Sequence, residues 1–374
     1  MKKPRPAKSN SAAKAATLRQ VAALAKVSAM TVSNFMNGRF QAMSEETRAR
    51  IAQTVAELNY RPHSAGRGLR TAAGLLIGMI LVDESPTFLT DPFITQVVSG
   101  LSNCLSQHGY GLVLQGLPIR DFRASPLIRD QRTDAFCVML SGRTAQRHEV
   151  LSILAALHCP IVLFQERPPR DARDICAIRQ DDLRGGRILA RHLVELGARR
   201  ILFLTPELTW PAITDRVKGI SNELAVIGDH AALEVLSCGD GSFTAAETIL
   251  DVHLEANGFP DAIMGGNDQL GIAALKVATA HGLKIPQDLL VTGFNAFEFW
   301  RYSDPVLTSA HSPAYEIGAR GGEEIIARLK EGSFREREIV YPVELIVGPS
   351  TVAKKNDPQL LRPFTQLRSL PYRK

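Results

Sequence analysis

The sequence predicts a small all-α N-terminal unit that contains a helix-turn-helix, followed by a larger α/β core made of two lobes. Residues 17–62 show short amphipathic helical patterns, whereas from residue 75 onward apolar strand-like runs alternate with helical patterns. The net charge changes from positive to negative at nearly the same place. Residues 1–70 carry 13 basic and three acidic residues, net +10, while residues 71–353 carry a net charge of −9. A small cationic unit on an acidic body is typical of proteins that bind the phosphate backbone of nucleic acids.

The composition is that of a folded protein of a reducing compartment. Of the 374 residues, 45% are apolar and 22% are charged, and roughly 100–200 residues per domain predicts two or three domains. The five cysteines have no CxxC spacing, so we expect buried thiols, without disulfides or a metal site. The most apolar early run, residues 75–82, is far shorter than the roughly 20 residues that cross a bilayer, and no signal peptide pattern precedes it. We therefore expect a cytoplasmic protein with no membrane partner.

Three helical patterns make up the N-terminal unit. The first begins at Thr17 with a capping box, the second runs from Ala29 to Met36 with Val32 and Phe35 facing inward, and the third begins at Ser44. Three short helices with a tight turn between the first two are the arrangement that places the second helix in the major groove of DNA. A generic helical bundle has the same periodicity and is the alternative.

The order of residues in this unit carries a stronger signal. It contains Thr17-Leu-x-x-Val21-Ala22, Val27-Ser28-x-x-Thr31-Val32-Ser33, Asn37, Ser44-x-x-Thr47-Arg48 and Leu58-Asn59-Tyr60-x-Pro62. This string resembles the headpiece of LacI/GalR-type bacterial transcription regulators, and it implies a sequence-specific DNA-binding repressor. Lys26 stands where the family often has Gly or Asn, in a tight turn whose left-handed backbone costs Lys roughly 1 kcal/mol.

The resemblance implies a role for each polar position of the headpiece. Ala29, Met30 and Asn34, with Ser33 beside them, take the base-reading positions, where Asn can pair with adenine and the apolar side chains can contact a thymine methyl group. The residues assigned to phosphates are Thr17, Ser28, Thr31, Asn37 and Arg48. For Thr17 and Ser28 helix capping alone is the alternative.

Residues 63–71 align with the family's hinge helix, which orders on operator DNA. Leu69 matches the residue that wedges into the minor groove, with Arg67 beside it. Gly66 and Gly68 each cost a helix roughly 0.8–1 kcal/mol relative to Ala, so we expect this hinge to fold only on DNA and beside a partner hinge. A plain flexible linker is the alternative. Since the hinges act in pairs, we expect a homodimer on a pseudo-palindromic double-stranded operator.

Nine apolar runs in the core predict strands. They cover residues 75–82, 111–115, 135–140, 161–164, 175–178, 201–204, 233–236, 262–264 and 289–292. Their alternation with helical patterns predicts parallel sheets covered by helices, in two lobes that divide near residue 166. The core also carries the motifs Asp91-Pro92-Phe93, Leu193-x-x-Leu196-Gly197-x-Arg199-Arg200-Ile201, Arg216-x-x-Gly219, Gly266-Asn267-Asp268-Gln269, Val291-Thr292-Gly293-Phe294-Asn295 and Pro305-x-Leu307-Thr308.

From Leu75 to Val352 this pattern resembles the LacI/GalR core, which is related to periplasmic sugar-binding proteins. The resemblance implies two Rossmann-like, periplasmic-binding-protein-like lobes, and we place the three chain crossings between them near Glu166, Trp300 and Arg337. A ligand of such folds binds in the crevice at the carboxyl ends of the strands. The angle between the lobes would then set the spacing of the two hinge helices in the dimer.

Carried over residue by residue, the resemblance predicts an effector site in the cleft between the lobes. Its residues are Asp83 and Phe93 on one side and Arg216, Asn267 and Asn295 on the other. Other roles are open for these positions: Asp83 could cap a turn, and Phe93 could lie in the core. The neighbouring Asp268 is expected to be the N-cap of the helix through Ala280 and not a ligand contact.

The amide at position 295, where relatives often carry Asp, favours a small molecule with carbonyl or carboxylate groups, within a class of sugars and related metabolites. The two tryptophans, Trp210 and Trp300, could add aromatic walls to the cleft.

No GxSxG, Walker A, HExxH or GxGxxG string occurs, so we expect neither an enzyme nor a cofactor. The expected domains are a disordered basic arm (1–16), the headpiece (17–62), the hinge (63–71), the two-lobed effector-binding and dimerisation core (72–352) and a basic tail (353–374). Three prolines in the tail exclude a leucine heptad.

The function that these observations favour is that of a cytoplasmic, nucleoid-associated repressor controlled by a small molecule in the cleft. An intracellular solute receptor without specific operator recognition is the alternative.

Overall fold

The structure is a computed structural model that describes residues 18–36, 39–40, 43–58, 76–86, 88–130, 133–157, 159–169, 174–207, 210–227 and 231–352. The chain divides into two compact units, Met1–Gly74 and Leu75–Lys374. Four residues with predicted roles on DNA, Thr17, Asn37, Arg67 and Leu69, lie outside the described residues, as do the predicted arm, hinge and basic tail. Within the described ranges, no helix combines the length and the apolar character that a bilayer span requires.

The first unit contains three helices, α1 (Leu18–Leu24), α2 (Ala29–Met36) and α3 (Glu45–Glu57). They pack around a small core in which five apolar side chains are buried: Val21, Ala22, Ala25, Val32 and Ile51. Lys26, in the turn between α1 and α2, has the expected left-handed backbone with φ +50°. The three predicted helices are therefore confirmed.

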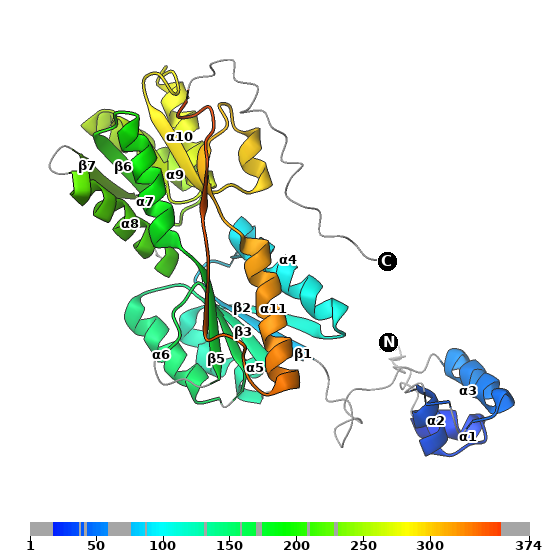
Figure 1. The fold of residues 1–374 in the computed structure, drawn as a ribbon. Coiled ribbons are helices and arrows are strands. Elements are labelled where there is room, and N and C mark those ends of the chain that lie inside the picture. Colours follow the sequence, from blue (N-terminus) through cyan, green and yellow to red (C-terminus); the bar gives the residue numbers. More distant parts are fainter. Residues whose placement is uncertain are drawn as a thin grey trace, which may run out of the picture. The chain divides into compact units, whose positions relative to one another are not determined.

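The N-lobe of the second unit is a six-stranded, fully parallel sheet with the strand order β11-β5-β4-β3-β1-β2. Its strands are β1 (Leu76–Val82), β2 (Gly111–Leu117), β3 (Ala135–Leu140), β4 (Ile161–Phe164), β5 (Ile175–Gln180) and β11 (Glu338–Tyr341). One face is covered by α4 (Pro92–Gln107) and α11 (Ala314–Glu331), which lie side by side (Figure 1). The other face is covered by η3 (Ile119–Ala124), α5 (Pro126–Asp130) and α6 (Thr144–Ala155), while η2 (Phe88–Thr90) precedes α4.

The C-lobe repeats this plan with the strand order β12-β10-β9-β8-β6-β7, in which only the β10–β12 pair is antiparallel. Its strands are β6 (Arg200–Thr205), β7 (Ala232–Ser237), β8 (Ala262–Gly265), β9 (Leu290–Asn295), β10 (Thr308–His311) and β12 (Glu344–Ile346). Helices α7 (Asp182–Glu195) and α8 (Pro211–Ile227) cover one face, and α9 (Phe243–Asn257) and α10 (Asp268–Ala280) the other. The short helix η4 (Glu298–Tyr302) follows β9.

Apolar runs form the strands because each sheet is buried on both faces. In β1, Ile77 and Met79 belong to the core cluster beneath α4 and α11, whereas Ile80 and Val82 belong to the cluster on the opposite face. A strand covered by helices on both sides has no solvent face, so its sequence is continuously apolar rather than alternating. This confirms the predicted parallel sheets, and all nine predicted strands are present.

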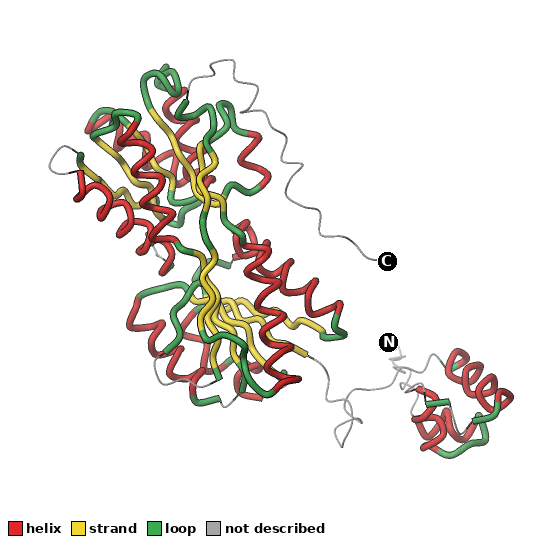
Figure 2. Tube along the Cα trace, viewed as in Figure 1, coloured by secondary structure: helices red, strands yellow, loops and turns green. Residues whose placement is uncertain are grey.

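The chain passes between the lobes at three places, after β5, after β10 and between β11 and β12 (Figure 2). The predicted crossings near Glu166 and Trp300 are wrong, whereas the third lies just after β11, a few residues beyond Arg337. Residue 166 lies in a loop of the N-lobe, because β5 pairs with β4 in the same sheet. Trp300 lies in η4 of the C-lobe, and Arg337 precedes β11, which pairs with β5.

The misplaced crossings have two physical causes. Strand β5 was predicted, but its pairing with β4 in the same sheet cannot be read from the local sequence. Three further strands, β10, β11 and β12, were not predicted. In β10, Thr308 and Ser309 are fully buried, and their hydroxyl groups donate to the Gly348 carbonyl at 3.1 Å and to Asp268 Oδ1 at 2.6 Å. Hydrogen bonds therefore replace apolar character inside this strand. The other two, β11 and β12, are short edge strands.

Candidate functional site

The outward face of α2 holds the predicted base-reading residues. Met30 is 70% exposed and Ala29 is exposed as well, while Ser33 and Asn34 are half-buried. Val32 on the opposite face is fully buried and Phe35 packs against the same small core. Because Val32 and Phe35 face the core, Ala29 and Met30 lie on the side of α2 that is accessible to a partner, as the helix that enters the major groove requires.

One of the described phosphate candidates, Ser28, is a helix-capping residue. The Thr31 N–H donates to Ser28 Oγ at 3.0 Å, and the two hydroxyl oxygens lie 2.8 Å apart, so Ser28 caps α2. Ser44 caps α3 in the same way, accepting from the Thr47 N–H at 3.3 Å. The Arg48 guanidinium lies over the Phe40 ring, 3.9 Å from its centroid. A capped N-terminus also attracts anions, so capping and phosphate binding are compatible roles for Ser28.

Three of the five predicted effector residues come together in the C-lobe. The Arg216 Nε donates to Asp182 Oδ1 at 2.8 Å, its Nη1 donates to the carbonyl of Gly266, and its guanidinium lies 3.5 Å from the Phe294 ring centroid. Gly266 and Phe294 directly precede Asn267 and Asn295 in the sequence. The structure therefore places these residues at the carboxyl ends of β8 and β9, where ligands of such sheets bind.

Glycines in two neighbouring helices position Arg216. A Cβ atom at Gly219 of α8 would collide with the Leu183 carbonyl oxygen of α7, and one at Gly186 of α7 would collide with the carbonyl oxygen of Arg216 itself. The absence of both Cβ atoms lets α7 and α8 pack backbone to backbone. This close approach brings Arg216 to Asp182, the first residue of α7.

The backbone of Asn295 is strained, and its side-chain oxygen has an unused hydrogen-bonding capacity. Its φ is +108° and that of Ala296 is +51°, both in the left-handed range that non-glycine residues rarely adopt. The side chain is 6% exposed, and its Oδ1 has no hydrogen-bond partner among the described residues. A buried acceptor left without a donor costs about 1–3 kcal/mol, so its position calls for an explanation beyond packing.

Asp83 and Phe93, the other two predicted effector residues, make contacts within the fold, and so does Asn267. Asp83 Oδ1 accepts the Ser85 N–H at 2.8 Å, which is the turn-capping alternative, and Phe93 is buried in the core cluster beneath α4. Asn267 Oδ1 accepts the Leu270 N–H at 2.9 Å and is the N-cap of α10. The predicted cap at Asp268 is wrong, because that residue is the first of the helix and its carboxylate is buried against Ser309.

The two tryptophans lie in different surroundings. Trp210 packs against the N-lobe core cluster, whereas Trp300 is buried in the C-lobe with Arg301 over its ring.

Asp91, which was not among the predicted effector residues, interacts electrostatically with Arg216 from the other lobe. Asp91 Oδ1 accepts the Phe93 N–H at 2.8 Å and caps α4. Burial raises the pKa of Asp91; the Phe93 N–H and the Arg216 charge oppose this, and the Asp83 charge adds to it. The Asp-Pro pair before a helix is an N-cap signature, so capping could have been predicted from the sequence, but its proximity to Arg216 could not.

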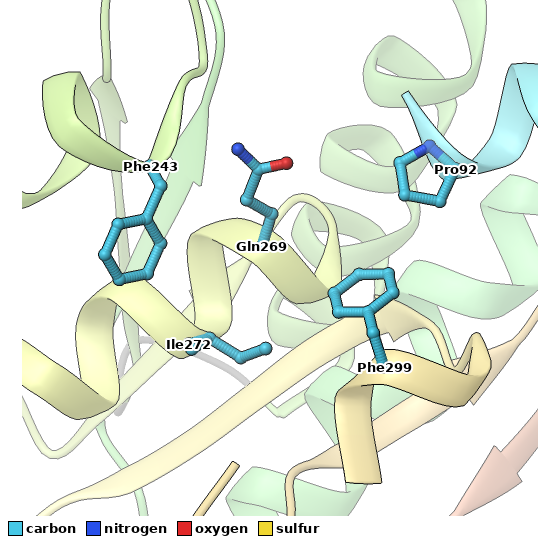
Figure 3. Close-up of a pocket in the computed structure, with 5 residues that line it drawn as sticks. All are labelled: Pro92, Phe243, Gln269, Ile272 and Phe299. Atoms are coloured by element: carbon cyan, nitrogen blue, oxygen red, sulfur yellow. The ribbon is translucent and has the colours of Figure 1, made fainter. Parts of the chain in front are cut away.

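A pocket of about 270 Å³ lies between the lobes, where the effector site was predicted, but its lining residues are not the predicted ones. It is lined by Pro92 from α4 and by four residues of the C-lobe: Phe243, Gln269, Ile272 and Phe299 (Figure 3). Phe243 and Gln269 lie in the first turns of helices that follow β7 and β8. The rule that ligands bind beyond strand ends indicates these turns, although no motif marks them.

The buried Asp268 beside this pocket predicts a pH-dependent stability. Burial raises its pKa to about 7, against the lowering effect of the Ser309 hydroxyl and of backbone N–H groups. A carboxyl whose pKa is higher in the folded state stabilises the fold below its unfolded pKa of 3.8 and loses that contribution as the pH rises through about 7.

Between pH 5.5 and pH 8, wild-type protein should therefore lose about 2 kcal/mol of unfolding free energy relative to Asp268→Asn, whose side chain cannot ionise. Denaturant unfolding of both proteins across this range measures the difference. A difference between them that stays constant with pH would contradict the assignment.

Comparisons with known proteins agree with this architecture. The model of bacterial regulatory proteins of the lacI family matches residues 17–63, and the periplasmic binding protein-like domain matches residues 190–351. The HTH-type transcriptional repressor PurR of Vibrio atlanticus (strain LGP32) is 27% identical over 344 residues, which are 91% of this chain and 100% of that protein. PurR of Aliivibrio fischeri (strain ATCC 700601 / ES114) is 28% identical over 342 residues, with 90% and 98% covered.

Solved structures share the fold along the chain. The lac repressor dimer bound to operator and the anti-inducer ONPF is 23% identical, with a TM-score of 0.78 over 91% of this chain and 100% of that one. A complex of the transcriptional regulator CelR with cellobiose is 24% identical, with a TM-score of 0.64 over 90% and 99%.

A trihelical unit with an exposed second helix, joined to two parallel-sheet lobes, defines a DNA-binding transcription regulator with an effector-binding core. The chain belongs to the LacI/GalR family.

Proposed function

We propose that this regulator is a repressor that binds a pseudo-palindromic operator as a homodimer and whose operator affinity depends on a small molecule held between the lobes. The observation that carries the proposal is the outward face of α2, where Met30 is 70% exposed beside Ala29 and Asn34 while the rest of the unit packs. The names of the PurR relatives support repression, and the lac repressor solved as a dimer on its operator supports the assembly. A solute receptor without operator recognition would leave the α2 face without a role.

Within this function the headpiece residues divide into two groups. Ala29, Met30, Ser33 and Asn34 would contact bases, and Ser28, Thr31 and Arg48, together with Thr17 and Asn37, would contact phosphates. We further propose that residues 17–62 form the headpiece, that residues 63–71 form a hinge with Leu69 and Arg67 at the minor groove, and that residues 72–352 form the core. The arm (1–16) and the tail (353–374) would add positive charge near DNA.

In the core, Asn295 is the strongest candidate for an effector contact. No described residue donates to its buried Oδ1, and a ligand N–H or O–H would supply that donor. Asn267 and Arg216 surround the same strand ends, although Arg216 is already bonded to Asp182 and Gly266. Asp83 and Phe93 would act indirectly, by holding the loop before α4 and α4 itself in place.

Control of DNA binding would follow from linkage between the two sites. A ligand that binds one arrangement of the lobes more tightly shifts the hinges toward the spacing of that arrangement, and DNA must change ligand affinity by the same factor. An inducer favours the arrangement that separates the hinges, and a corepressor the opposite one. This chemistry needs no catalysis and no cofactor, and its place would be the cytoplasm, at the nucleoid.

Asn34→Ala tests base reading by α2. We expect the variant to lose about 1–3 kcal/mol of discrimination at one base step of the operator, because a bidentate amide pair with adenine disappears. Affinity for unrelated DNA should remain, since the phosphate contacts are intact. Competition binding with operators that differ at single positions measures both quantities.

Gln53→Ala, which removes an exposed amide from α3, is the matched control and should leave every preference unchanged. If Asn34→Ala keeps the wild-type preference at all positions, Asn34 does not read a base.

A further inference from the structure

His311 lies at the point where the chain leaves the C-lobe for the N-lobe. It is the last residue of β10, and α11 of the N-lobe begins at Ala314. The intervening Ser312 is buried; its N–H donates to the Asn295 carbonyl at 3.0 Å, and its hydroxyl donates to Gln180 at the end of β5. The half-buried His311 therefore lies beside two of the three crossings between the lobes.

Glu344 is a partner of His311 at a fixed distance. The two residues are opposite each other in the antiparallel pair of β10 and β12, which places their side chains on the same face of the sheet, roughly 5 Å apart at Cβ. Glu344 is exposed and is the first residue of β12, just after the third crossing. Since both strands belong to the C-lobe sheet, a movement of one lobe against the other leaves this distance unchanged.

Glu316 is a partner of His311 at a variable distance. It lies in the first turn of α11, which packs on the N-lobe sheet. The second crossing separates it from His311, so a rotation of the lobes changes the distance between the His311 ring and the Glu316 carboxylate. The interaction between two charges weakens with distance, and solvent screens it least at partly buried positions. A proton on His311 therefore favours the lobe arrangement in which the two groups are closer.

Burial and the two carboxylates set the protonation of His311. Burial lowers the pKa of His311, and the Glu316 and Glu344 charges oppose this effect. The neighbouring residue in β9, Asn295, is uncharged. With its pKa below the ordinary value of 6.5, the imidazole is neutral at pH 7 and takes up a proton as the pH falls below that value. Protonation then destabilises this arrangement relative to one that brings Glu316 nearer.

We propose that His311 is a proton sensor at the junction of the lobes. Its protonation draws Glu316 of the N-lobe toward the C-lobe, which shifts the equilibrium between lobe arrangements and, with it, operator affinity. The regulator then responds to acidification as well as to its effector. The link to operator affinity rests on the proposed function, because there the lobe arrangement controls DNA binding.

Spin labels measure the lobe arrangement without DNA. The labels are attached at two exposed positions of the full-length chain, Ser152→Cys in α6 and Ser221→Cys in α8, with Cys159→Ser added because the other four native cysteines are buried. An excess of unlabelled chain leaves one distance per labelled chain. Pulsed electron paramagnetic resonance gives the distance distribution at pH 7.5 and pH 5.5.

We expect the distribution to shift between the two pH values when His311 is present. With His311→Gln, whose amide cannot take up the proton, the distribution seen at pH 7.5 should persist at pH 5.5. Absence of a shift in the chain with His311, or the same shift in both chains, overturns the proposal.

Operator affinity provides a second measurement. For the operator found by selection, wild-type affinity should change by about threefold or more between pH 7.5 and pH 5.5, and His311→Gln should lose this change. Asp268 and His192, whose pKa values are also shifted, remain in the variant, so the comparison isolates His311. His148→Gln removes an exposed histidine of α6 and is the matched control, with the wild-type pH profile. An equal pH dependence in wild type and His311→Gln contradicts the proposal.

The two carboxylates separate a sensor from a structural residue. Glu316→Gln should abolish the distance shift, because the variable partner is lost. Glu344→Gln should keep the shift but move its midpoint to lower pH, since this carboxylate raises the pKa of His311. Both residues are exposed, so Glu316→Gln carries the test if His311→Gln disturbs folding, as seen in its thermal unfolding. An unchanged shift in Glu316→Gln rules out the sensor.

The proposed function fails separately from this inference. Absence of any preferred DNA sequence would remove the regulator role, while the spin-label distances would still decide whether His311 controls the lobes. Conversely, an unchanged distance distribution removes the sensor and leaves operator selection intact.

Discussion

Arg216→Ala is expected to lower the unfolding free energy of the two-lobed unit by about 3–5 kcal/mol, because it leaves the buried Asp182 carboxylate without its counter-charge. Both side chains are about 95% buried, and the guanidinium also donates to the Gly266 carbonyl and stacks on Phe294. Denaturant unfolding of the variant measures the loss.

The control for this prediction is the removal of an ion pair on the protein surface. Arg123 and Glu149 lie 3.0 Å apart with 69% and 61% of their side chains exposed, and Arg123→Ala should cost at most about 1 kcal/mol. If Arg216→Ala costs no more than this control, Arg216 does not hold the C-lobe together.

The Asp182 carboxylate also accepts hydrogen bonds from residues near the first crossing between the lobes. Gln180 Nε2 donates to Asp182 Oδ1 at 2.9 Å and Gln165 Nε2 donates to Oδ2 at 3.2 Å, while the Ser312 hydroxyl at the second crossing donates to Gln180. Residues from both lobes therefore share one buried polar network. Loss of effector binding in Arg216→Ala would follow from this structural role alone, so Asn295 and Gln269 are better positions for testing ligand contact.

Ile51→Ala is expected to abolish most sequence-specific DNA binding. Ile51 is fully buried in a core that, among the described residues, contains five buried apolar side chains, and truncating such a side chain costs about 2–5 kcal/mol. Units of this size have little stability to spare, so a large fraction of the headpiece should be unfolded. We expect operator affinity to fall at least tenfold, with the thermal transition of the larger unit unchanged.

Leu24→Ala is the matched control, because Leu24 is a 61% exposed apolar residue of the same unit. It should leave operator affinity within about twofold. Wild-type affinity in Ile51→Ala would show that the trihelical unit is not required for DNA binding.

Local signals in the sequence were sufficient for the headpiece and most strands. The α2 helix could be bounded at Ala29 and Met36 because its apolar spacing is helical, and strands such as β3 could be bounded because both faces of each sheet are covered. The first crossing could not be placed because the pairing of β5 with β4 is not marked in the local sequence. The second could not be placed because Thr308 and Ser309 of β10 are polar residues whose hydroxyl groups are satisfied only after folding. Pairing across more than a hundred residues, as between β5 and β11, leaves no local trace.

The candidate site was predicted in part for a similar reason. Arg216 and Asn295 lie on recognisable motifs at strand ends, so their meeting could be expected from topology. Which of their hydrogen-bonding groups remain unused depends on side-chain packing, and here Arg216 is bound by Asp182 while Asn295 Oδ1 is not bound. Phe243 and Phe299 carry no motif, and only the folded structure brings them to one pocket.

The most direct test of the account is selection of bound sequences from random duplex DNA at near-physiological salt, with the full-length chain compared with a chain that starts at Thr71. We expect only the full-length chain to enrich a two-fold symmetric site. Enrichment by the shortened chain, or failure of the full-length chain to enrich any site with and without a metabolite mixture, would contradict the central claim that the first unit reads a specific operator.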